Sequence, residues 1–247
     1  MHRALTLCLT ALLTIAPPAT AGTVSGRLVD SRLEVTFRAA ARERNEMRIL
    51  PHVSGVRVVD SAEIVTGEHC MRVNEHDARC GPPAPGGLLV TAYTGDGADV
   101  VSTRAGIAHL GPGRDLGIAL AERGSLHGGP GDDRLRAAGR GASAFGGVGR
   151  DELLGGGRGD LILEGGPGPD FVVGRSGDDR LDAGAGRDHL AGGRGRDEIA
   201  AGPGNDFVRA SDEARDLVRC GSGRDRAFVS RNDRARGCER VTLGWPD

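Results

Sequence analysis

Hydrophobic positions between residues 165 and 209 recur every nine residues. Cut at that period, the stretch reads GGPGPDFVV, GRSGDDRLD, AGAGRDHLA, GGRGRDEIA and AGPGNDFVR, with no insertion between copies. The first four places of each copy are rich in glycine, the sixth is aspartate and the eighth is aliphatic. A short fixed period of this kind is typical of a solenoid, in which every repeat adds a similar unit to a stack.

Each place in the nine has a physical reason. Glycine is needed where the backbone takes a positive φ or approaches another backbone closely, so the first places predict a tight turn. The last three residues predict a short strand whose middle side chain points inward. If each nine is half a coil, residues 18 apart stack at the strand spacing of roughly 4.7–4.9 Å. The narrow core is then formed by Val172, Leu181, Leu190, Ile199 and Val208.

The sixth-place aspartates would form a column along the turns. Unit charges ~4 Å apart repel by ~1 kcal/mol even in bulk water, so a cation is expected between them. The pattern GGxGxDxUx, with U a large aliphatic residue, resembles the RTX or haemolysin-type calcium-binding nonapeptide. This resemblance implies an all-β fold, a right-handed parallel β-roll (β-solenoid). It also implies several Ca²⁺ ions between stacked turns, held by the sixth-place aspartate and by backbone carbonyls.

Further copies flank the five. They are TGDGADVVS (94–102), LGPGRDLGI (110–118), GGPGDDRLR (128–136), GGVGRDELL (146–154), SDEARDLVR (211–219) and CGSGRDRAF (220–228). Residues 137–145 contain no acid and predict a half-turn without its carboxylate. Residues 155–164 carry one extra residue, so either Asp160 or the glycines keep phase, and we favour Asp160 as a ligand. The resemblance thus implies these calcium ligands: Asp99, Asp115, Asp133, Asp151, Asp160, Asp170, Asp179, Asp188, Asp197, Asp206, Asp216 and Asp225.

Residues 1–21 have the features of a secretory signal peptide. A positive N-terminus precedes an apolar run from Ala4 to Ala16 that is too short to span a membrane, and residues 19–21 form a small-residue cleavage site. We expect cleavage after Ala21 and a secreted, extracellular protein that leaves by the general secretion route. No later stretch of the sequence is long and apolar enough for a transmembrane helix.

Four cysteines remain once Cys8 is removed with the signal peptide, and an even number in an exported protein predicts disulfides. Cys220 and Cys238 are 18 apart, one full coil, so in a regular roll their Cα atoms would stack within the disulfide range of roughly 4.4–6.8 Å. Cys70 and Cys80 predict a second local bridge. For Cys220 and Cys238 the alternative is two free thiols or a metal pair. For Cys70 and Cys80 the alternative is a zinc site completed by His69 and His76.

Residues 22–93 are less regular. Short runs typical of strands alternate with Gly, Pro, Asn or Asp, which fits either a degenerate start of the solenoid or a small separate β domain. A solenoid needs an atypical end to close its core. We therefore expect 22–93 to be an irregular β-rich N-terminal cap, 94–228 the nonapeptide β-roll and 229–247 a disulfide-bonded C-terminal cap.

Arginine complicates the calcium interpretation. Every basic residue is arginine, and between 128 and 228 there are 18 Asp plus Glu against 15 Arg, whereas a calcium-loaded roll is expected to be strongly acidic. Either the arginines at the fifth place point to solvent, or they pair with the aspartates in bidentate fashion so that some turns need no metal. These arginines are Arg150, Arg187, Arg196, Arg215 and Arg224. A net charge of −2 is too balanced to indicate a nucleic-acid partner.

No catalytic motif accompanies the repeats. The chain has no lysine for a G-x-x-x-x-G-K-[ST] loop, no H-E-x-x-H, and no Ser/His/Asp constellation whose spacing indicates hydrolysis. We predict a non-enzymatic, monomeric β-roll whose partner is calcium and whose metal is structural. The alternatives are a cell-surface or matrix adhesion solenoid, a calcium-independent solenoid held by Arg–Asp pairs, and an enzyme with its site in 22–93.

Overall fold

The computed structural model describes residues 21–244 apart from 30–31, 39–45, 53–54, 61–62, 67–69, 75–76, 81–87, 104–105, 121 and 158–161. Before residue 91, side chains are described only at 36–38, 47 and 48. The expected signal peptide apart from Ala21, and the expected ligand Asp160, therefore lie outside the described residues. So do His69 and His76.

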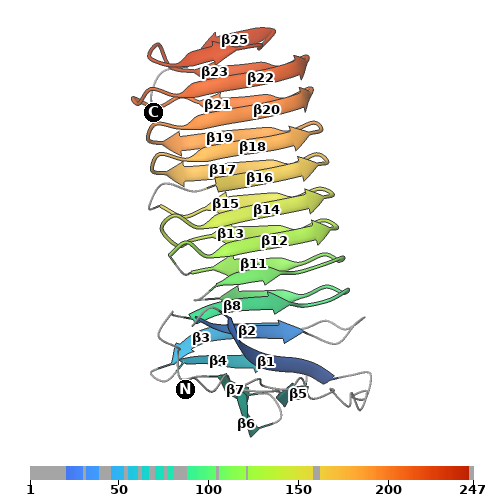
Figure 1. Cartoon of the computed structure of the whole chain (residues 1–247). Helices are drawn as coiled ribbons and strands as arrows, with labels where there is room; N and C mark the ends of the chain where they lie inside the picture. Colours follow the sequence, from blue (N-terminus) through green and yellow to red (C-terminus); the bar gives the residue numbers. More distant parts are fainter. Residues whose placement is uncertain are drawn as a thin grey trace, which may run out of the picture.

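The described strands form two long sheets, and from β8 onward the chain crosses from one sheet to the other after every strand (Figure 1). The 12-stranded sheet runs β24-β22-β20-β18-β16-β14-β12-β10-β8-β2-β1-β5, and the 13-stranded sheet runs β25-β23-β21-β19-β17-β15-β13-β11-β9-β3-β4-β7-β6. The described residues form strands, turns and bends but no helix. The described part of the chain therefore contains no helix that is long and apolar enough to cross a membrane. The expected parallel β-solenoid is confirmed.

The strands are short, as expected for half-coils. Those of the 12-stranded sheet are β1 (Ala21–Val29), β2 (Arg32–Arg38), β5 (Glu63–Thr66), β8 (Leu88–Tyr93), β10 (Ile107–His109), β12 (Ser125–Pro130), β14 (Ser143–Val148), β16 (Ile162–Pro167), β18 (Arg180–Ala185), β20 (Glu198–Gly204), β22 (Leu217–Gly223) and β24 (Arg234–Arg236). Those of the 13-stranded sheet are β3 (Glu46–His52), β4 (Gly55–Asp60), β6 (Cys70–Asn74), β7 (Asp77–Cys80), β9 (Val100–Thr103), β11 (Leu116–Ala119), β13 (Arg134–Ala137), β15 (Glu152–Gly155), β17 (Phe171–Ser176), β19 (His189–Arg194), β21 (Phe207–Ala210), β23 (Arg226–Val229) and β25 (Arg240–Leu243).

Two nonapeptides make one coil, as the nine-residue period predicts. Parallel pairing places Leu163 beside Leu181 and Leu181 beside Ile199, so equivalent positions are 18 residues apart. The eighth-place side chains alternate with exposed neighbours and point between the sheets, where they are at most 2% exposed. The core is therefore one layer of aliphatic side chains that each coil extends, and stability comes from contacts between neighbouring coils.

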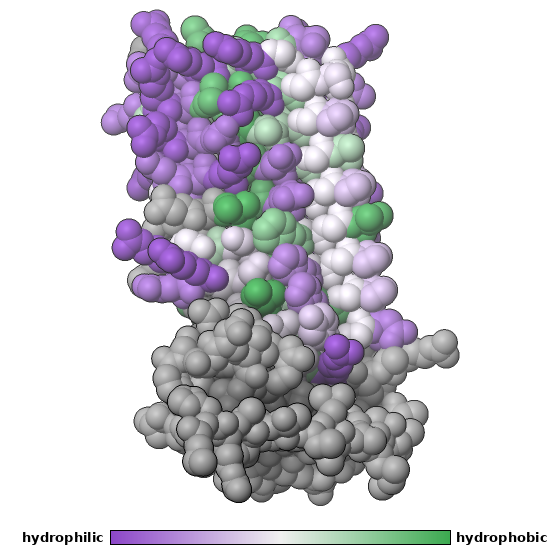
Figure 2. All heavy atoms as spheres, viewed as in Figure 1, coloured by the Kyte–Doolittle hydropathy of each residue, from purple (hydrophilic) through white to green (hydrophobic). Residues whose placement is uncertain are grey.

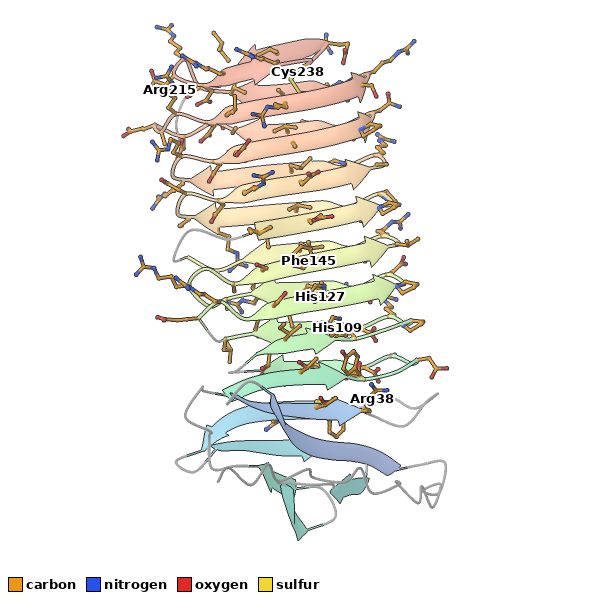
Figure 3. All side chains as sticks on the ribbon, viewed as in Figure 1. Arg38, His109, His127, Phe145, Arg215 and Cys238 are labelled. Carbon is orange, nitrogen blue, oxygen red and sulfur yellow. A yellow bond between two sulfur atoms is a disulfide. The ribbon has the colours of Figure 1, made fainter. Side chains whose placement is uncertain are left out.

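The outer faces of the sheets carry side chains in matching rows. Tyr93, His109, His127 and Phe145 lie on successive strands of the 12-stranded sheet and stack with ring centroids 4.6–4.9 Å apart (Figure 3). That separation matches the spacing between neighbouring strands. Each outward position therefore meets the same position on the coils before and after it.

Strands from residues 21–93 continue both sheets. In the 12-stranded sheet β8 pairs parallel with β2, which pairs antiparallel with β1. In the other sheet β9 pairs parallel with β3, which pairs antiparallel with β4. Cys70 and Cys80 are opposite each other in the antiparallel pair β6–β7. Their side chains are outside the described set, so the Cys70–Cys80 disulfide stays a prediction.

The C-terminal end is held by the predicted Cys220–Cys238 disulfide, with a Cα–Cα distance of 5.1 Å. The strands beside it are offset by 17 residues rather than 18, because Arg219 pairs with Arg236. Cys238 therefore lies one residue beyond the position in register with Cys220. The bridge joins neighbouring coils as expected, although the last coil is shorter than the regular period.

Candidate metal centres

The sixth-place aspartates line the two edges of the roll, because successive nonapeptides turn at alternate edges. The long column precedes strands of the 13-stranded sheet and contains Asp99, Asp115, Asp133, Asp151, Asp170, Asp188, Asp206 and Asp225. The short column precedes strands of the 12-stranded sheet and contains Asp179, Asp197 and Asp216, followed by Asp233. Every described sixth-place aspartate is at most 3% exposed. At the edge of the short column nearer the N-terminus, the buried Ala142 precedes β14 instead of an acid.

In nine of the described sixth-place aspartates, one oxygen accepts a hydrogen bond from the coil before it. Asp170 Oδ1 accepts a hydrogen bond from the backbone N–H of Asp151 at 2.8 Å, and Asp188 Oδ1 accepts one from Asp170 N–H at 2.8 Å. The short column repeats this contact between Asp179 N–H and Asp197 Oδ1 at 2.8 Å. The carboxylates therefore tie consecutive turns together, which positions each side chain without any metal.

Two further acids end the columns. Asp233 Oδ1 accepts from Asp216 N–H at 2.9 Å, and Glu239 Oε2 accepts from Asp225 N–H at 2.7 Å. The nine-residue period did not find them, because they lie 17 and 14 residues after their partners in turns that lack the glycine pattern. The only signal in the sequence was an acidic residue about one coil after the last copy in each column, at a spacing shorter than the regular 18 residues.

The second oxygen has no hydrogen-bond partner in most of these aspartates. Among the described residues, a buried Oδ2 without such a partner occurs at Asp115, Asp133, Asp151, Asp170, Asp188, Asp197, Asp206, Asp216 and Asp225. Buried polar atoms are nearly always paired, and an unpaired carboxylate oxygen is among the costliest exceptions. Because the same oxygen is unpaired at equivalent positions in both columns, we infer that these oxygens contact a ligand and not another group of the protein.

The surroundings of Asp170 show what kind of ligand fits. A Cβ built on Gly165 would lie 2.5 Å from Asp170 Oδ2 and 2.6 Å from the carbonyl oxygen of Ala183 on the next coil. Two acceptor oxygens thus converge on the space that the first-place glycine leaves free. The short column repeats this arrangement at Gly174, where the same construction gives 2.7 Å to Asp179 Oδ2 and 2.6 Å to the Gly192 carbonyl. Oxygens alone, from carboxylates and carbonyls, are the donor set that Ca²⁺ prefers.

Side chains alone would not complete a coordination shell here. Across the described ranges, no three His, Cys, Asp or Glu side chains gather around a common point. An ion between the coils would therefore take one carboxylate oxygen from each contributing aspartate and its remaining protein oxygens from backbone carbonyls. Calcium accepts such mixed oxygen ligands in flexible geometry, whereas Mg²⁺ demands a near-ideal octahedron.

Comparison with known proteins agrees with this donor set. The family model of the RTX calcium-binding nonapeptide repeat, taken in four copies, matches residues 155–190, 164–199 and 184–214. The chain carries RTX calcium-binding repeats. The matched RTX repeats include aspartates from both columns. No curated protein and no solved structure matches the chain.

Burial raises the pKa of eight carboxyls in the two aspartate columns: those of Asp115, Asp133, Asp151, Asp170, Asp188, Asp197, Asp206 and Asp216. The pKa is about 7 for Asp115, Asp133 and Asp170, and about 8 for Asp197. Desolvation is the main cause; the backbone hydrogen bond from the previous coil lowers the pKa, and neighbouring aspartates of the column raise it. Without metal, carboxyls of the long and short columns therefore hold protons near neutral pH.

These values predict that the calcium-free protein loses stability as the pH rises from about 5 to about 8. An unfolded aspartate has a pKa of about 3.9, whereas the folded carboxyls titrate at about 6 to about 8. Between these limits the folded state binds more protons, so its stability falls with rising pH. Circular dichroism in EDTA should show more β structure at pH 5 than at pH 8, with light scattering as a control for aggregation. Equal β signals at the two pH values would contradict the prediction.

The fifth-place arginines point away from the RTX carboxylates. Arg150, Arg187, Arg196, Arg215 and Arg224 are all exposed. The described ion pairs join arginines to outward acids instead, for example Arg196 to Asp178 at 3.2 Å and Arg134 to Glu152 at 3.1 Å. The geometry matches the first of the two interpretations, in which the fifth-place side chains face solvent.

Proposed function

We propose that the protein is an exported, non-enzymatic calcium-binding β-roll in which Ca²⁺ lies between stacked turns and is required for folding. The observation that carries this proposal is the repeated buried Oδ2 of the sixth-place aspartates, which faces a carbonyl oxygen of the next coil. The RTX repeats matched at residues 155–214 support the same ion. Asp170 and Ala183 provide one such pair in the long column, and Asp179 and Gly192 provide one in the short column.

Coupling between folding and binding follows from where the oxygens come from. Each pair of oxygens belongs to two coils, so the site does not exist until those coils are stacked. Stacking without an ion brings acceptors together with no donor between them, and burial disfavours their ionised form. Binding free energy therefore becomes folding free energy. With one carboxylate per coil, we expect affinities in the ~10⁻⁴–10⁻³ M range of extracellular modules.

Coupling of folding to calcium binding would suit a protein that is exported before it folds. The N-terminal 21 residues have the pattern of a signal peptide, and the Cys220–Cys238 disulfide suits an oxidising compartment. At low intracellular Ca²⁺ the chain would stay loose enough for secretion, and it would fold on meeting millimolar Ca²⁺ outside. In this scheme the ion is structural and performs no chemistry on a substrate.

A calcium titration of the mature chain at pH 8 tests the proposal. We expect a weak β signal in EDTA that rises cooperatively with Ca²⁺ and does not rise with the same concentration of Mg²⁺. Isothermal titration calorimetry should give several ions per chain. A β signal that ignores EDTA, together with no heat on adding Ca²⁺, would instead support the calcium-independent solenoid.

A further inference from the structure

Four exposed arginines form a patch at the C-terminal end of the 12-stranded sheet and the adjoining edge. We propose that this patch binds a linear anionic polysaccharide laid along the roll. The arginine patch consists of Arg215, in the turn before β22, Arg219 on β22, and Arg234 and Arg236 on β24. Figure 2 shows hydrophilic side chains gathered over this end of the roll, at the upper left of the view.

Charge is distributed unevenly along the roll. Between residues 207 and 244 there are nine arginines and six acids, and two of those acids, Asp216 and Asp225, are buried in the columns. Between 94 and 206 there are 18 acids and 13 arginines. The surface of the last coils is therefore basic although the chain as a whole is slightly acidic. A basic surface of this kind attracts polyanions.

The patch keeps most of its charge available. In the described part of the chain, Arg215, Arg234 and Arg236 form no ion pair, and all three are exposed. Asp212 lies in the same turn as Arg215, but its carboxylate oxygens accept from the backbone N–H groups of Gly195 and Ala214. Its neighbour Glu213 is exposed and offsets part of the positive charge.

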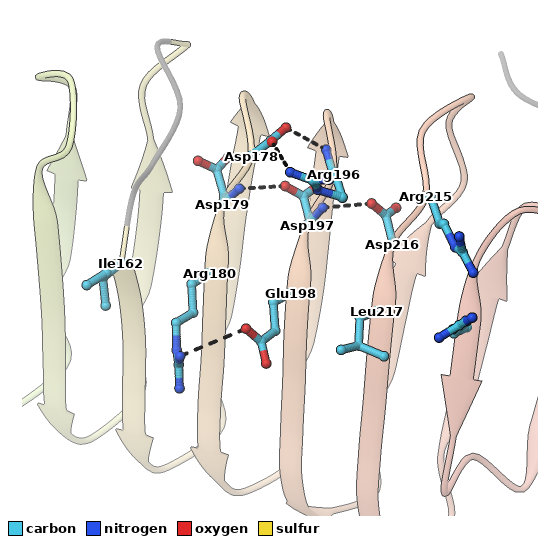
Figure 4. Close-up of a pocket in the computed structure, with 11 residues that line it drawn as sticks. Ile162, Asp178, Asp179, Arg180, Arg196, Asp197, Glu198, Arg215, Asp216 and Leu217 are labelled. Carbon is cyan, nitrogen blue, oxygen red and sulfur yellow. Dashed lines mark hydrogen bonds and ion pairs between the residues drawn. The ribbon is translucent and has the colours of Figure 1, made fainter.

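The remaining arginines along this face are held only weakly. Arg219 contacts Glu198 at 2.5 Å, and the same carboxylate lies 3.9 Å from Arg180 (Figure 4). All these side chains are more than a third exposed, and such surface pairs contribute only about 0.2–1 kcal/mol. An anionic ligand could compete for Arg219 and Arg180 at little cost, although Glu198 stays as a negative group between them, so the basic surface is centred on β22 and β24.

The register of strands β22 and β24 brings positive charges of the arginine patch close together. Arg219 and Arg236 are direct partners on the neighbouring parallel strands β22 and β24, and Arg234 shares the outward face of Arg236. Like charges directly opposite each other on a sheet are destabilising. An anion that bridges the guanidinium groups would remove this repulsion, and their planar donors suit carboxylate and sulfate oxygens.

The shape of the surface points to a polymer. A groove of about 650 Å³ passes over the strands from β16 to β24 and is lined by four arginines, five acids, Leu217 and Ile162. The arginines are Arg180, Arg196, Arg215 and Arg234. Three of the acids, Asp179, Asp197 and Asp216, are buried candidate calcium ligands, and the other two, Asp178 and Glu198, are paired with Arg196 and Arg180. Strands repeat at roughly 4.7–4.9 Å, so the cationic groups are spread along the axis of the roll. A linear chain with repeated negative groups can meet them together, while a small anion can meet only one or two.

Sugar rings suit this groove better than nucleotide bases. Binding of single-stranded nucleic acid depends on aromatic side chains on which bases stack. No aromatic residue lines the described groove; the nearest aromatic row on this sheet, ending at Phe145, lies on earlier coils. The apolar surface of Leu217 and Ile162 is small and aliphatic, which fits the C–H faces of sugars. The occupant is therefore assigned as a polysaccharide carrying carboxylate or sulfate groups.

Binding of the full calcium-loaded mature chain to three probes tests the proposal: heparin, hyaluronate and single-stranded DNA. Arg234→Ala/Arg236→Ala should weaken binding of at least one polysaccharide by about tenfold or more, because two charge-assisted contacts are lost. It should also flatten the dependence of affinity on salt. Arg134→Ala/Arg136→Ala on β13 is the matched control, since it removes the same Arg-x-Arg pair from the other sheet.

Each outcome decides the matter. Preference for heparin assigns sulfate, and preference for hyaluronate assigns carboxylate. Equal loss of binding in both double variants would show that net charge alone is responsible and would overturn the patch. DNA binding as tight as that of either polysaccharide, or no polysaccharide binding in 50 mM salt at about 1 mM probe, would overturn the ligand class. An unchanged calcium titration in both variants confirms that they fold, so failure here is distinguishable from failure of the calcium proposal.

Discussion

Gly168→Ala should destabilise the calcium-loaded roll by about 3 kcal/mol or more. Gly168 occupies the fourth place of its nonapeptide and has φ +144°, a conformation that side chains rarely adopt. A Cβ there would also collide with the backbone carbonyl of Gly149 on the preceding coil. Neither the strained backbone angle nor the collision can relax without separating two stacked turns. Urea unfolding at saturating Ca²⁺, followed by circular dichroism, measures the loss.

Gly157→Ala is the matched control for this substitution. Gly157 also lies in a glycine-rich turn, but a Cβ on it would meet no atom within 4 Å, and its φ is not in the left-handed region. Replacing a glycine at such a position is neutral or stabilises by about 0.4–1 kcal/mol, because it restricts the unfolded chain. Similar destabilisation by the two substitutions would show that the close packing of consecutive turns is not what requires Gly168.

The regular part of this fold could be predicted from the sequence because it depends on local, repeated chemistry. An aliphatic residue every ninth position has one arrangement in which all copies are buried, and the register of Leu181 with Ile199 follows from it. The same repetition placed Asp170, Asp188 and Asp206 along one edge. Because the roll is a stack of similar units, a correct prediction for one repeat applies to all of them.

Departures from the repeat could not be predicted in the same way. The antiparallel pairing of β3 with β4 joins residues in segments without a period, so tertiary contacts decide it. Asp233 and Glu239 end the columns only because the last coils are shortened. The first-place glycine also has a reason that backbone preference does not reveal. At Gly165 the requirement is room for Asp170 Oδ2 and the Ala183 carbonyl.

The aspartate therefore has two distinct tasks. One oxygen joins coils through a backbone hydrogen bond, and the other faces an acceptor that only a cation or a proton can satisfy. The elevated pKa values express the second task, since a proton on Oδ2 would donate to the facing carbonyl. Acid and calcium should thus be alternative ways of closing the same gap between coils.

Asp170→Asn should separate these two tasks. Its amide oxygen can accept from Asp151 N–H as the carboxylate does, and its NH₂ group can donate to the Ala183 carbonyl. The calcium-free roll should gain about 1–3 kcal/mol, because a buried unpaired acceptor becomes a paired donor. At the same time the variant should bind fewer Ca²⁺ ions than the wild type. The measurements are the β signal in EDTA at pH 8 and the calorimetric stoichiometry.

Asp182→Asn makes the same change of charge on the exposed face of β18 and serves as the control. It should leave both the signal in EDTA and the number of bound ions as in the wild type. If Asp170→Asn weakened the roll in EDTA while its calcium stoichiometry stayed intact, the buried oxygen would not be a metal ligand. If it raised the EDTA signal and removed calcium binding together, a carboxylate that is unfavourable without its ion would be the element that makes folding depend on calcium.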